Sequence, residues 1–222
     1  MRMCASWRLR AVGLAAAIAP LVMATAASAR DTTTPDWPCV QRKIETVTST
    51  QVWAGPAVDE ISGWREDATV KDLVRLLADR RVPIDFADAA IKRFADNGDA
   101  SARSERLTLL FAGLFSVLQD QRRTMMGHLE DYLRAQRSRA LDLERQGLEI
   151  ADLEQKAATD ENAAAELREA QTRFDLAYRI FQERQASITI ACEIPVRIDQ
   201  RAFTLGQSIH DLMLPVTGQA PQ

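Results

Sequence analysis

The sequence predicts an all-α protein in which a multi-helix base carries a long antiparallel coiled-coil hairpin. Three observations support this fold class. No proline occurs between Gly98 and Pro195, so nothing in that stretch obliges a helix to end. Large apolar side chains recur there at spacings of three, four and seven residues, which is typical of helices that pack along a seam. A content of 46% hydrophobic and 27% charged residues fits folded soluble domains and excludes a disordered chain.

Residues 1–29 have the pattern of a secretion signal. A basic start is followed by an alanine-rich apolar run over residues 11–29, which ends in the small residues Ala-Ser-Ala. We therefore expect cleavage after Ala29 and a periplasmic mature protein. The alternative is an uncleaved membrane anchor, which the weak apolarity of alanine and the interruption by Pro20 disfavour.

Removal of this leader makes the protein more acidic. It takes away three arginines and no acid, so the formal net charge changes from −3 to −6. An acidic protein gains nothing from phosphate backbones or anionic lipid surfaces. We expect no nucleic-acid partner and no membrane insertion after cleavage.

Two cysteines remain after cleavage, Cys39 and Cys192. In an oxidising compartment such a pair most simply forms one structural disulfide. A redox-active pair is the alternative, but the two residues do not form a Cys-x-x-Cys motif.

Residues 30–66 are expected to form an irregular N-terminal segment, ahead of a helical domain over residues 67–222. Breakers are closely spaced in this segment, and all three tryptophans of the mature chain lie in it: Pro35, Trp37, Pro38, Trp53, Gly55, Pro56, Gly63 and Trp64. Burial of the rings against the helices is the favoured interpretation, and ligand contact is the alternative.

Two short amphipathic helices are predicted next. The first has Thr69 as its N-cap and ends before Pro83. The second is marked by apolar residues at helical spacing and closes at Asn97-Gly98; these residues are Phe86, Ala90, Ile91 and Phe94.

The hairpin is predicted over residues 101–194. Its first arm has a seam that Gln136 and Ala140 interrupt, formed by Leu107, Phe111, Leu114, Leu118, Met125, Leu129, Tyr132, Leu143 and Ile150. Its second arm is more regular and only Arg184 interrupts it; the seam is Leu167, Ala170, Phe174, Ala177, Phe181, Ile188 and Ala191.

A turn near Ala157 and Thr159 is expected to join the two arms. A continuous helix over residues 101–194 would be about 140 Å long and would leave its seam uncovered. Thr159 is the expected cap of the returning helix. The antiparallel register then places Leu148 opposite Leu167 and Leu141 opposite Phe174.

Residues 107–118 are apolar on nearly all sides, so other helices must cover them. The candidates are the two short helices and a last helix that begins at Pro195. The apolar residues of that last helix recur at spacings of four and three: Ile198, Ala202, Leu205, Ile209 and Leu212.

Few residue patterns support a chemical site. Met125, Met126 and His128 lie within one helical turn, and thioether plus imidazole groups suit copper. His210 has no companion ligands and is expected at a surface or helix end. The sequence contains none of the motifs for covalent haem, diiron, phosphate-loop, serine hydrolase or zinc protease sites. We expect a protein that is not an enzyme and has no cofactor.

Four strings carry a family resemblance: residues 36–41 (DWPCVQ), residues 107–115 (LTLLFAGLF), residues 180–184 (IFQER) and the region from Cys192-Glu193 to residues 200–203. Together they resemble a group of uncharacterised exported helical proteins of alphaproteobacteria. The resemblance spans most of the mature chain. It implies no activity and transfers no catalytic residue.

Two functional hypotheses follow. In the first, the protein is a periplasmic adaptor, assembly factor or chaperone-like scaffold whose hairpin binds another envelope protein or a second copy of the chain. In the second, it is a periplasmic ligand- or copper-binding protein that uses the methionine–histidine turn or the tryptophan-rich segment.

Overall fold

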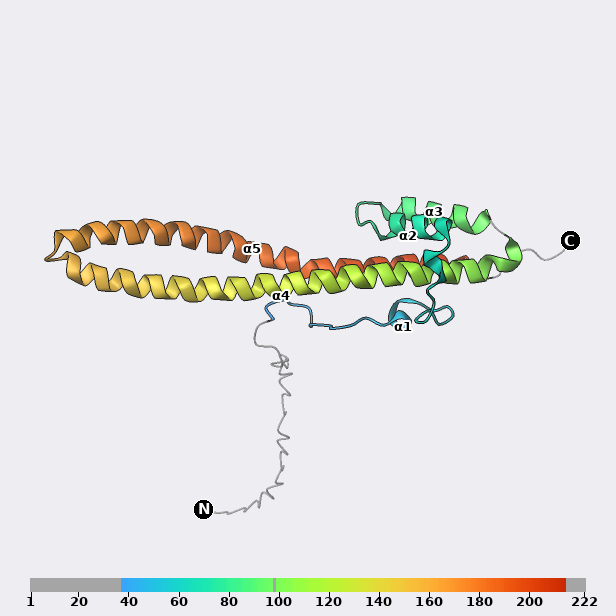
Figure 1. The fold of residues 1–222 in the computed structure, drawn as a ribbon, viewed down its shortest axis with the longest axis horizontal. Coiled ribbons are helices and arrows are strands. Elements are labelled where there is room, and N and C mark those ends of the chain that lie inside the picture. Colours follow the sequence, from blue (N-terminus) through green and yellow to red (C-terminus); the bar gives the residue numbers. More distant parts are fainter. Residues whose placement is uncertain (1–36, 98, 215–222) are drawn as a thin grey trace, which may run out of the picture. The chain divides into compact units, whose positions relative to one another are not determined.

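The computed structural model describes residues 37–97 and 99–214, which belong to one compact unit, Asp36–Gln222. The described residues form helices and no strands, which confirms the all-α prediction. Along these described residues, five α-helices and two short 3-10 turns follow each other (Figure 1): α1 (Ser49–Val52), η1 (Gly63–Arg65), α2 (Ala68–Ala78), α3 (Ile84–Asp96), η2 (Ala100–Ala102), α4 (Arg103–Ala157) and α5 (Glu161–Asp211). The expected leader 1–29 and its cleavage site after Ala29 lie outside the described residues.

α4 and α5 form the predicted antiparallel hairpin and run side by side along most of their length (Figure 1). The turn between them is where the sequence placed it, but its cap is different. Asp160, with an extended backbone, accepts a hydrogen bond from the Asn162 backbone N–H at 2.9 Å and is the N-cap of α5. The expected cap Thr159 is wrong, because its hydroxyl points back to the Lys156 carbonyl at 3.5 Å.

α5 also continues where a new helix was expected. Pro195 lies inside α5 instead of starting a separate helix. A proline lacks the N–H that would bond to the carbonyl of Ala191, which costs about 3 kcal/mol in a helix interior. Cys192, Pro195 and Ile198 are all buried, and this packing offsets the lost hydrogen bond. The predicted helix start at Pro195 is wrong because it rested only on the preference of proline for the first turn of a helix. The buried contacts of Pro195 cannot be seen in the sequence.

The short helices begin and end a few residues away from their predicted bounds. Asp67 caps α2 by accepting from the Val70 N–H at 3.0 Å, so Thr69 lies within the first turn and is not the cap. α2 ends at Ala78, and Pro83 is the N-cap of α3. An aspartate before the first turn is as good a cap as a threonine, and sequence pattern alone did not separate them.

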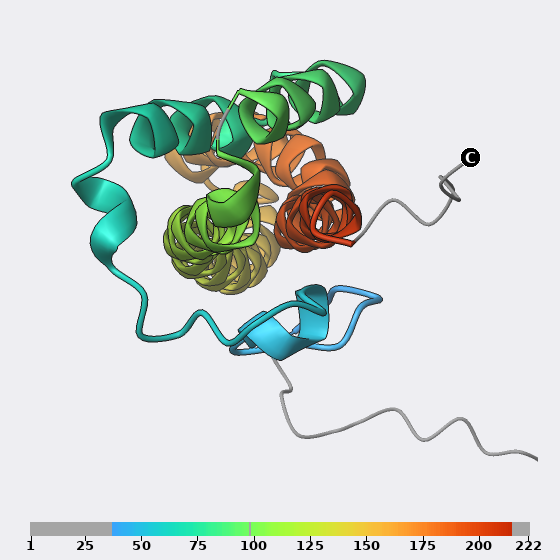
Figure 2. The ribbon, with the colours of Figure 1, turned by 90° about the vertical axis from the view of Figure 1, so that its right-hand side faces the viewer.

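The base has its core around the first third of α4. Eight of the twelve residues from 107 to 118 are buried, as their all-round apolar character predicted. α2 and α3 cover one side of the α4–α5 pair and the segment around α1 covers the opposite side (Figure 2). The largest fully buried side chains come from α2, α3, α4 and α5: Phe111, Leu77, Ile91, Leu107, Leu110, Leu114, Leu118, Ile198, Leu205, Ile209, Val70 and Val74.

The N-terminal segment packs its tryptophans into this core. Trp53 and Trp64 are buried and Trp37 is half-buried. Trp53 stacks on Phe111 with ring centroids 4.1 Å apart and meets the ring of His210 edge-on. Two tryptophans therefore contribute to the core, and His210 lies against one of them in the last turn of α5.

A buried arginine fastens α2 and the loop after it to α5. Arg201 donates from Nε to the Leu77 carbonyl at 2.7 Å and from Nη1 to the Val82 carbonyl at 2.9 Å. Burial lowers the pKa of Arg201 from its ordinary value, and the charges of Asp79 and Asp88 partly offset this effect. The guanidinium thus satisfies one carbonyl at the C-terminal end of α2 and one in the loop that leads to α3.

Candidate interaction surface

The part of the hairpin that extends beyond the base is the most distinctive surface of the molecule. We define the distal arm as residues 137–187, which include the ends of α4 and α5 and the turn between them. In Figure 1 it forms the left-hand part of the α4–α5 pair, away from α2 and α3. The distal arm therefore has only its own two helices with which to bury apolar side chains.

The distal arm buries very little. Of its 51 residues, four are buried: Leu143, Leu153, Ala163 and Ala170. The α5 residues predicted to form the seam lie on the inner side, with Leu167, Phe174, Ala177 and Phe181 half-buried and Arg184 exposed. Two helices with alanines at two of four buried positions give each other weak support.

Two leucines predicted to face α5 point elsewhere. Leu141 is 58% exposed and Leu148 is 69% exposed. The expected pairs Leu141–Phe174 and Leu148–Leu167 are therefore wrong. The antiparallel register of α4 against α5 is nevertheless close to the prediction. Leu143 is buried in the seam, and Leu141, two residues earlier, lies about 200° away around α4.

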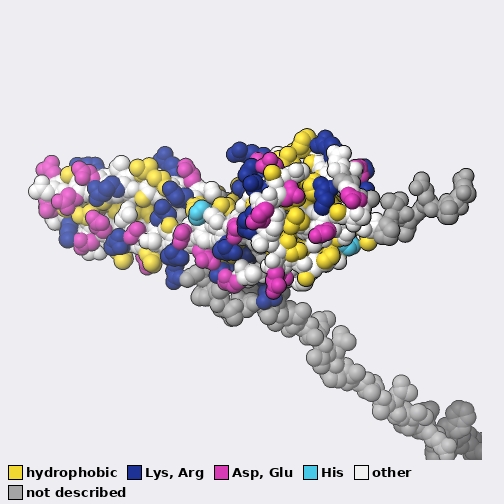
Figure 3. Space-filling view, turned by 45° about the vertical axis from the view of Figure 1, so that its right-hand side comes forward, with side chains coloured by type: hydrophobic (Ala, Val, Ile, Leu, Met, Phe, Trp, Pro, Cys, Tyr) yellow, Lys and Arg dark blue, Asp and Glu magenta, His cyan; other side chains and the backbone are white. Residues whose placement is uncertain are grey.

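Exposed apolar side chains occur on both helices of the distal arm. Leu141 and Leu148 are seven residues apart and share one face of α4, while Leu176 and Ile180 are four apart and share one face of α5. Tyr178 is 48% exposed and stacks on Phe174 with ring centroids 6.0 Å apart. On the visible face in Figure 3, apolar side chains lie among charged ones along this part of the molecule.

The tip of the distal arm is acidic. Residues 149–166 contain six acidic residues and one base, Lys156, which gives a formal charge of −5. Lys156 pairs with Asp152, and this hydrogen bond raises the lysine pKa above its ordinary value. The acidic side chains of this tip are Glu149, Asp152, Glu154, Asp160, Glu161 and Glu166, and all six are exposed.

A polar layer and a disulfide mark where the distal arm meets the base. Tyr132 donates its hydroxyl to the Arg184 carbonyl at 2.7 Å, and Gln136 donates its amide to the Phe181 carbonyl at 2.9 Å. About two turns further into the base along α5, the Cys39–Cys192 disulfide confirms the predicted pair. It lies in a small apolar cluster with Leu129, Leu133, Ile188, Trp37, Tyr132 and Ala191.

The disulfide ties down the strap, which we define as residues 37–48. Arg122 of α4 is 5% exposed at its side chain and donates from its two Nη atoms to the carbonyls of Ile44 and Glu45 in the strap. Lys43 pairs with Glu130 of α4 at 2.9 Å and with Glu45 at 2.7 Å, and these hydrogen bonds raise the lysine pKa. The strap is thus held covalently to α5 and by charge to α4.

Buried charged residues of this kind were not predicted from the sequence. Arg122 and Asp199 face each other across α4 and α5, and Arg201, two residues after Asp199, lies about 200° away around α5 and faces the end of α2. The signal was available for Arg122, which lies four residues after Leu118 and four before Met126 in an otherwise apolar stripe. Such a position requires a charged partner, and sequence alone does not name that partner.

The candidate copper ligands do not converge on one point. Met126 is buried and His128 is exposed, and two positions along a helix place them about 200° apart. Met125 is half-buried against the base core, one turn from His128. Within the part of the chain that the structure describes, no group of three or more His, Cys, Asp or Glu side chains has an arrangement suited to a metal ion.

The described helices also lack the features of a membrane span. Over residues 37–97 and 99–214, no helix combines enough length with enough hydropathy to cross a membrane. No protein-family model, curated protein sequence or solved structure matches this chain.

Proposed function

We propose that the chain is an adaptor of the cell envelope that binds another protein through its distal arm. The observation that carries this proposal is the contrast within one hairpin. The distal arm buries four of 51 side chains and still exposes Leu141, Leu148 and Leu176 by more than half. Apolar side chains on a weakly self-supported helical pair are stabilised when a partner helix or groove covers them.

The proposed compartment is the periplasm. The basic and alanine-rich start, the small residues before Arg30 and the Cys39–Cys192 disulfide support export. Mass spectrometry of the protein isolated from a native envelope fraction tests this proposal. A mature N-terminus at Arg30 is expected, and recovery of an intact residue 1 in the cytosolic fraction would contradict it.

Binding is tested with a triple variant of the distal arm, L141S/L148S/L176S. All three side chains are largely exposed, so the fold should persist while the apolar contact surface is lost. Crosslinking mass spectrometry in the native envelope should show crosslinks from wild-type residues 137–187 to a partner. The triple variant should lose at least about nine-tenths of them, since the loss of three exposed anchors weakens binding by more than tenfold.

The matched control changes three exposed polar positions of the same arm, E144S/Q155S/Q171S. It should keep the crosslinks of the wild type. A shortened hairpin without residues 139–152 and 164–177 provides a second test. It removes two heptads from each helix, so the remaining residues of α4 and α5 keep their register against each other. The proposal fails if either the triple variant or the shortened hairpin retains every partner at wild-type yield.

A second copy of the chain is the other occupant that this surface suits. Light scattering of the purified protein across a concentration series separates the two cases. A concentration-dependent dimer that L141S/L148S/L176S abolishes would show that the distal arm binds a second copy of the chain and not a different protein. A monomer at all concentrations together with wild-type crosslinks to a different protein supports the adaptor.

A further inference from the structure

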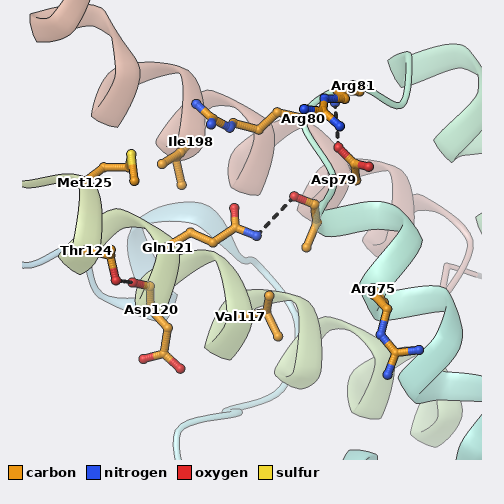
Figure 4. Close-up of a pocket in the computed structure, with 11 residues that line it drawn as sticks. Arg75, Asp79, Arg80, Arg81, Val117, Asp120, Gln121, Thr124, Met125 and Ile198 are labelled. Carbon is orange, nitrogen blue, oxygen red and sulfur yellow. Dashed lines mark hydrogen bonds between the residues drawn. The ribbon is translucent and has the colours of Figure 1, made fainter.

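An open groove of about 780 Å³ lies between the C-terminal end of α2 and the adjoining sides of α4 and α5 (Figure 4). The loop that follows α2 forms its upper edge in that view. Its lining comes from all three helices and the loop: Arg75, Ala78, Asp79, Arg80, Arg81, Val117, Asp120, Gln121, Thr124, Met125 and Ile198. The volume is within the range of sites that hold small molecules.

The floor of the groove is apolar. Ala78 and Ile198 are buried, and Val117 and Met125 are half-buried with one side against the base core. Figure 4 shows Met125, Ile198 and Val117 on either side of Gln121. A methionine at such a floor adapts its shape to a flexible apolar group.

The rim carries an excess of positive charge. Arg75, Arg80 and Arg81 are exposed there, and Arg75 pairs with Asp72 at 3.1 Å. The guanidinium groups of Arg80 and Arg81 have no hydrogen-bond or ion-pair partner among the described residues, and both lie on the loop directly above the floor. The guanidinium groups of two consecutive residues therefore remain available to an anion.

The two acidic residues of the groove are already engaged. Asp79 accepts a hydrogen bond from the Arg81 backbone N–H at 2.9 Å, and Asp120 pairs with Arg123 at 3.0 Å. The carbonyls at the end of α2 that lack a partner within the helix are also satisfied, since Gln121 donates to Ala78 at 3.3 Å and Arg201 donates to Leu77. The negative end of α2 is thereby compensated and does not cancel the charge of the rim.

We propose that this groove binds a single-chain amphiphilic anion. Its apolar chain lies on Met125 and Ile198, and its carboxylate or phosphate headgroup lies between Arg80 and Arg81. An apolar floor beside two unpaired guanidinium groups matches an apolar body with one anionic end, and the groove is too small for a folded protein partner. This site is separate from the distal arm and does not depend on its function.

Displacement of a fluorescent fatty acid, dansyl-undecanoate, from the mature protein tests the proposal. Competitors are used below their micelle concentrations. Dodecanoate and dodecyl phosphate should displace the probe, and the stronger of the two identifies the headgroup. Dodecanol, dodecyltrimethylammonium and inorganic phosphate should each need at least about tenfold higher concentrations, because each lacks the charge or the chain.

Variants connect the binding to the groove. R80A/R81A should weaken dodecanoate or dodecyl phosphate binding at least about tenfold, and T124W should abolish it by filling the groove. The matched control R134A/R145A removes the same charge from exposed α4 residues that already pair with Asp131 and Asp142, and it should bind as the wild type does. The arm variant L141S/L148S/L176S should also bind normally.

Circular dichroism and a thermal melt establish that each variant is folded. The proposal is overturned if dodecanol competes as well as dodecanoate and dodecyl phosphate. It is also overturned if R80A/R81A binds as the wild type does, or if R134A/R145A loses as much affinity as R80A/R81A. In that last case the protein attracts anions by its general charge and the groove is not the site.

Discussion

Arg122 of α4 and Asp199 of α5 form an ion pair across the two long helices, with Nε 2.9 Å from Oδ1. The same guanidinium donates to the carbonyls of Ile44 at 2.7 Å and Glu45 at 3.1 Å. One side chain thus joins the strap, α4 and α5 within the base.

Replacement of this arginine should destabilise the fold severely. R122M leaves Asp199 without its charge partner and two strap carbonyls without their donor, so the free energy of unfolding should fall by about 3 kcal/mol or more. The neighbouring variant R123M removes an exposed arginine paired with Asp120 and should change it by less than about 0.5 kcal/mol. Urea unfolding followed by circular dichroism measures both. Equal effects of the two variants would contradict this account of Arg122.

The pH dependence of stability should contain a signature of Asp199. Burial raises the pKa of Asp199 above its ordinary value, and the hydrogen bond and charge of Arg122 only partly offset this. A carboxyl group whose pKa is higher in the folded state contributes stability at pH values below its unfolded pKa, and this contribution is lost as pH rises through the folded pKa. Relative to D199N, the wild type should therefore gain stability as pH falls from 7 toward 4. Urea titrations across this pH range give the difference, and a gain in the opposite direction would refute the raised pKa.

The disulfide should contribute a large part of the free energy that keeps the strap bound to α4 and α5. It closes a loop with a sequence separation of 153 residues, for which the chain-entropy model predicts about 5 kcal/mol. C39S/C192S, or reduction of the wild type, should lower the urea midpoint and expose Trp37, which is detected by tryptophan fluorescence. Reduction of C39S/C192S serves as the control and should change neither quantity.

Four glycines separate into two groups with opposite expected effects. A Cβ at Gly113 would lie 2.8 Å from both Trp64 and Val74, and one at Gly206 would lie 2.5 Å from the Val52 carbonyl oxygen. G113A and G206A should therefore destabilise the protein by about 1–3 kcal/mol. A Cβ at Gly127 or Gly147 would have no neighbouring atom within 4 Å, so alanine should stabilise α4 by about 0.5–1 kcal/mol at each position. Thermal melts of the four single variants measure these effects. Destabilisation by G127A or G147A would contradict the free space for a Cβ at these two positions.

Gln136 offers a way to strengthen the junction between arm and base. It is 4% exposed, donates to the Phe181 carbonyl, and has an Oε1 atom with no hydrogen-bond partner among the described residues. Q136L removes that buried acceptor, while the Phe181 carbonyl keeps its own donor within α5. Stability should rise by about 1 kcal/mol. Hydrogen exchange of the amides around residues 132–140 is the measurement, and faster exchange in Q136L would show that the polar layer stabilises the junction.

The helices and the disulfide were predictable because they depend on local pattern and on a small number of alternatives. The absence of proline across residues 99–194, the seam of α5 and a single cysteine pair each left few competing structures. Caps were less predictable, because Asp67 and Thr69, or Asp160 and Thr159, are chemically similar choices a residue or two apart.

The surface of the distal arm and the groove were not predictable. A leucine every seventh residue marks one face of a helix, but only the rotation of α4 against α5 decides which face turns inward. That rotation makes Leu143 a seam residue and leaves Leu141 and Leu148 exposed. The groove joins Arg80 to Ile198, residues distant in sequence that only the packing of α2 onto the hairpin brings together.

α4 is a single 55-residue helix that begins in the core of the base and ends at the tip of the distal arm. No proline interrupts it, so base and arm share one rod and have no joint in this helix. The arm extends about 32 Å beyond Gln136 of the polar layer at a rise of 1.5 Å per residue. A tilt of about 10° at that level displaces the tip by about 6 Å on this geometry. A repacking of core side chains around Phe111 that tilted α4 would therefore move the acidic tip as well.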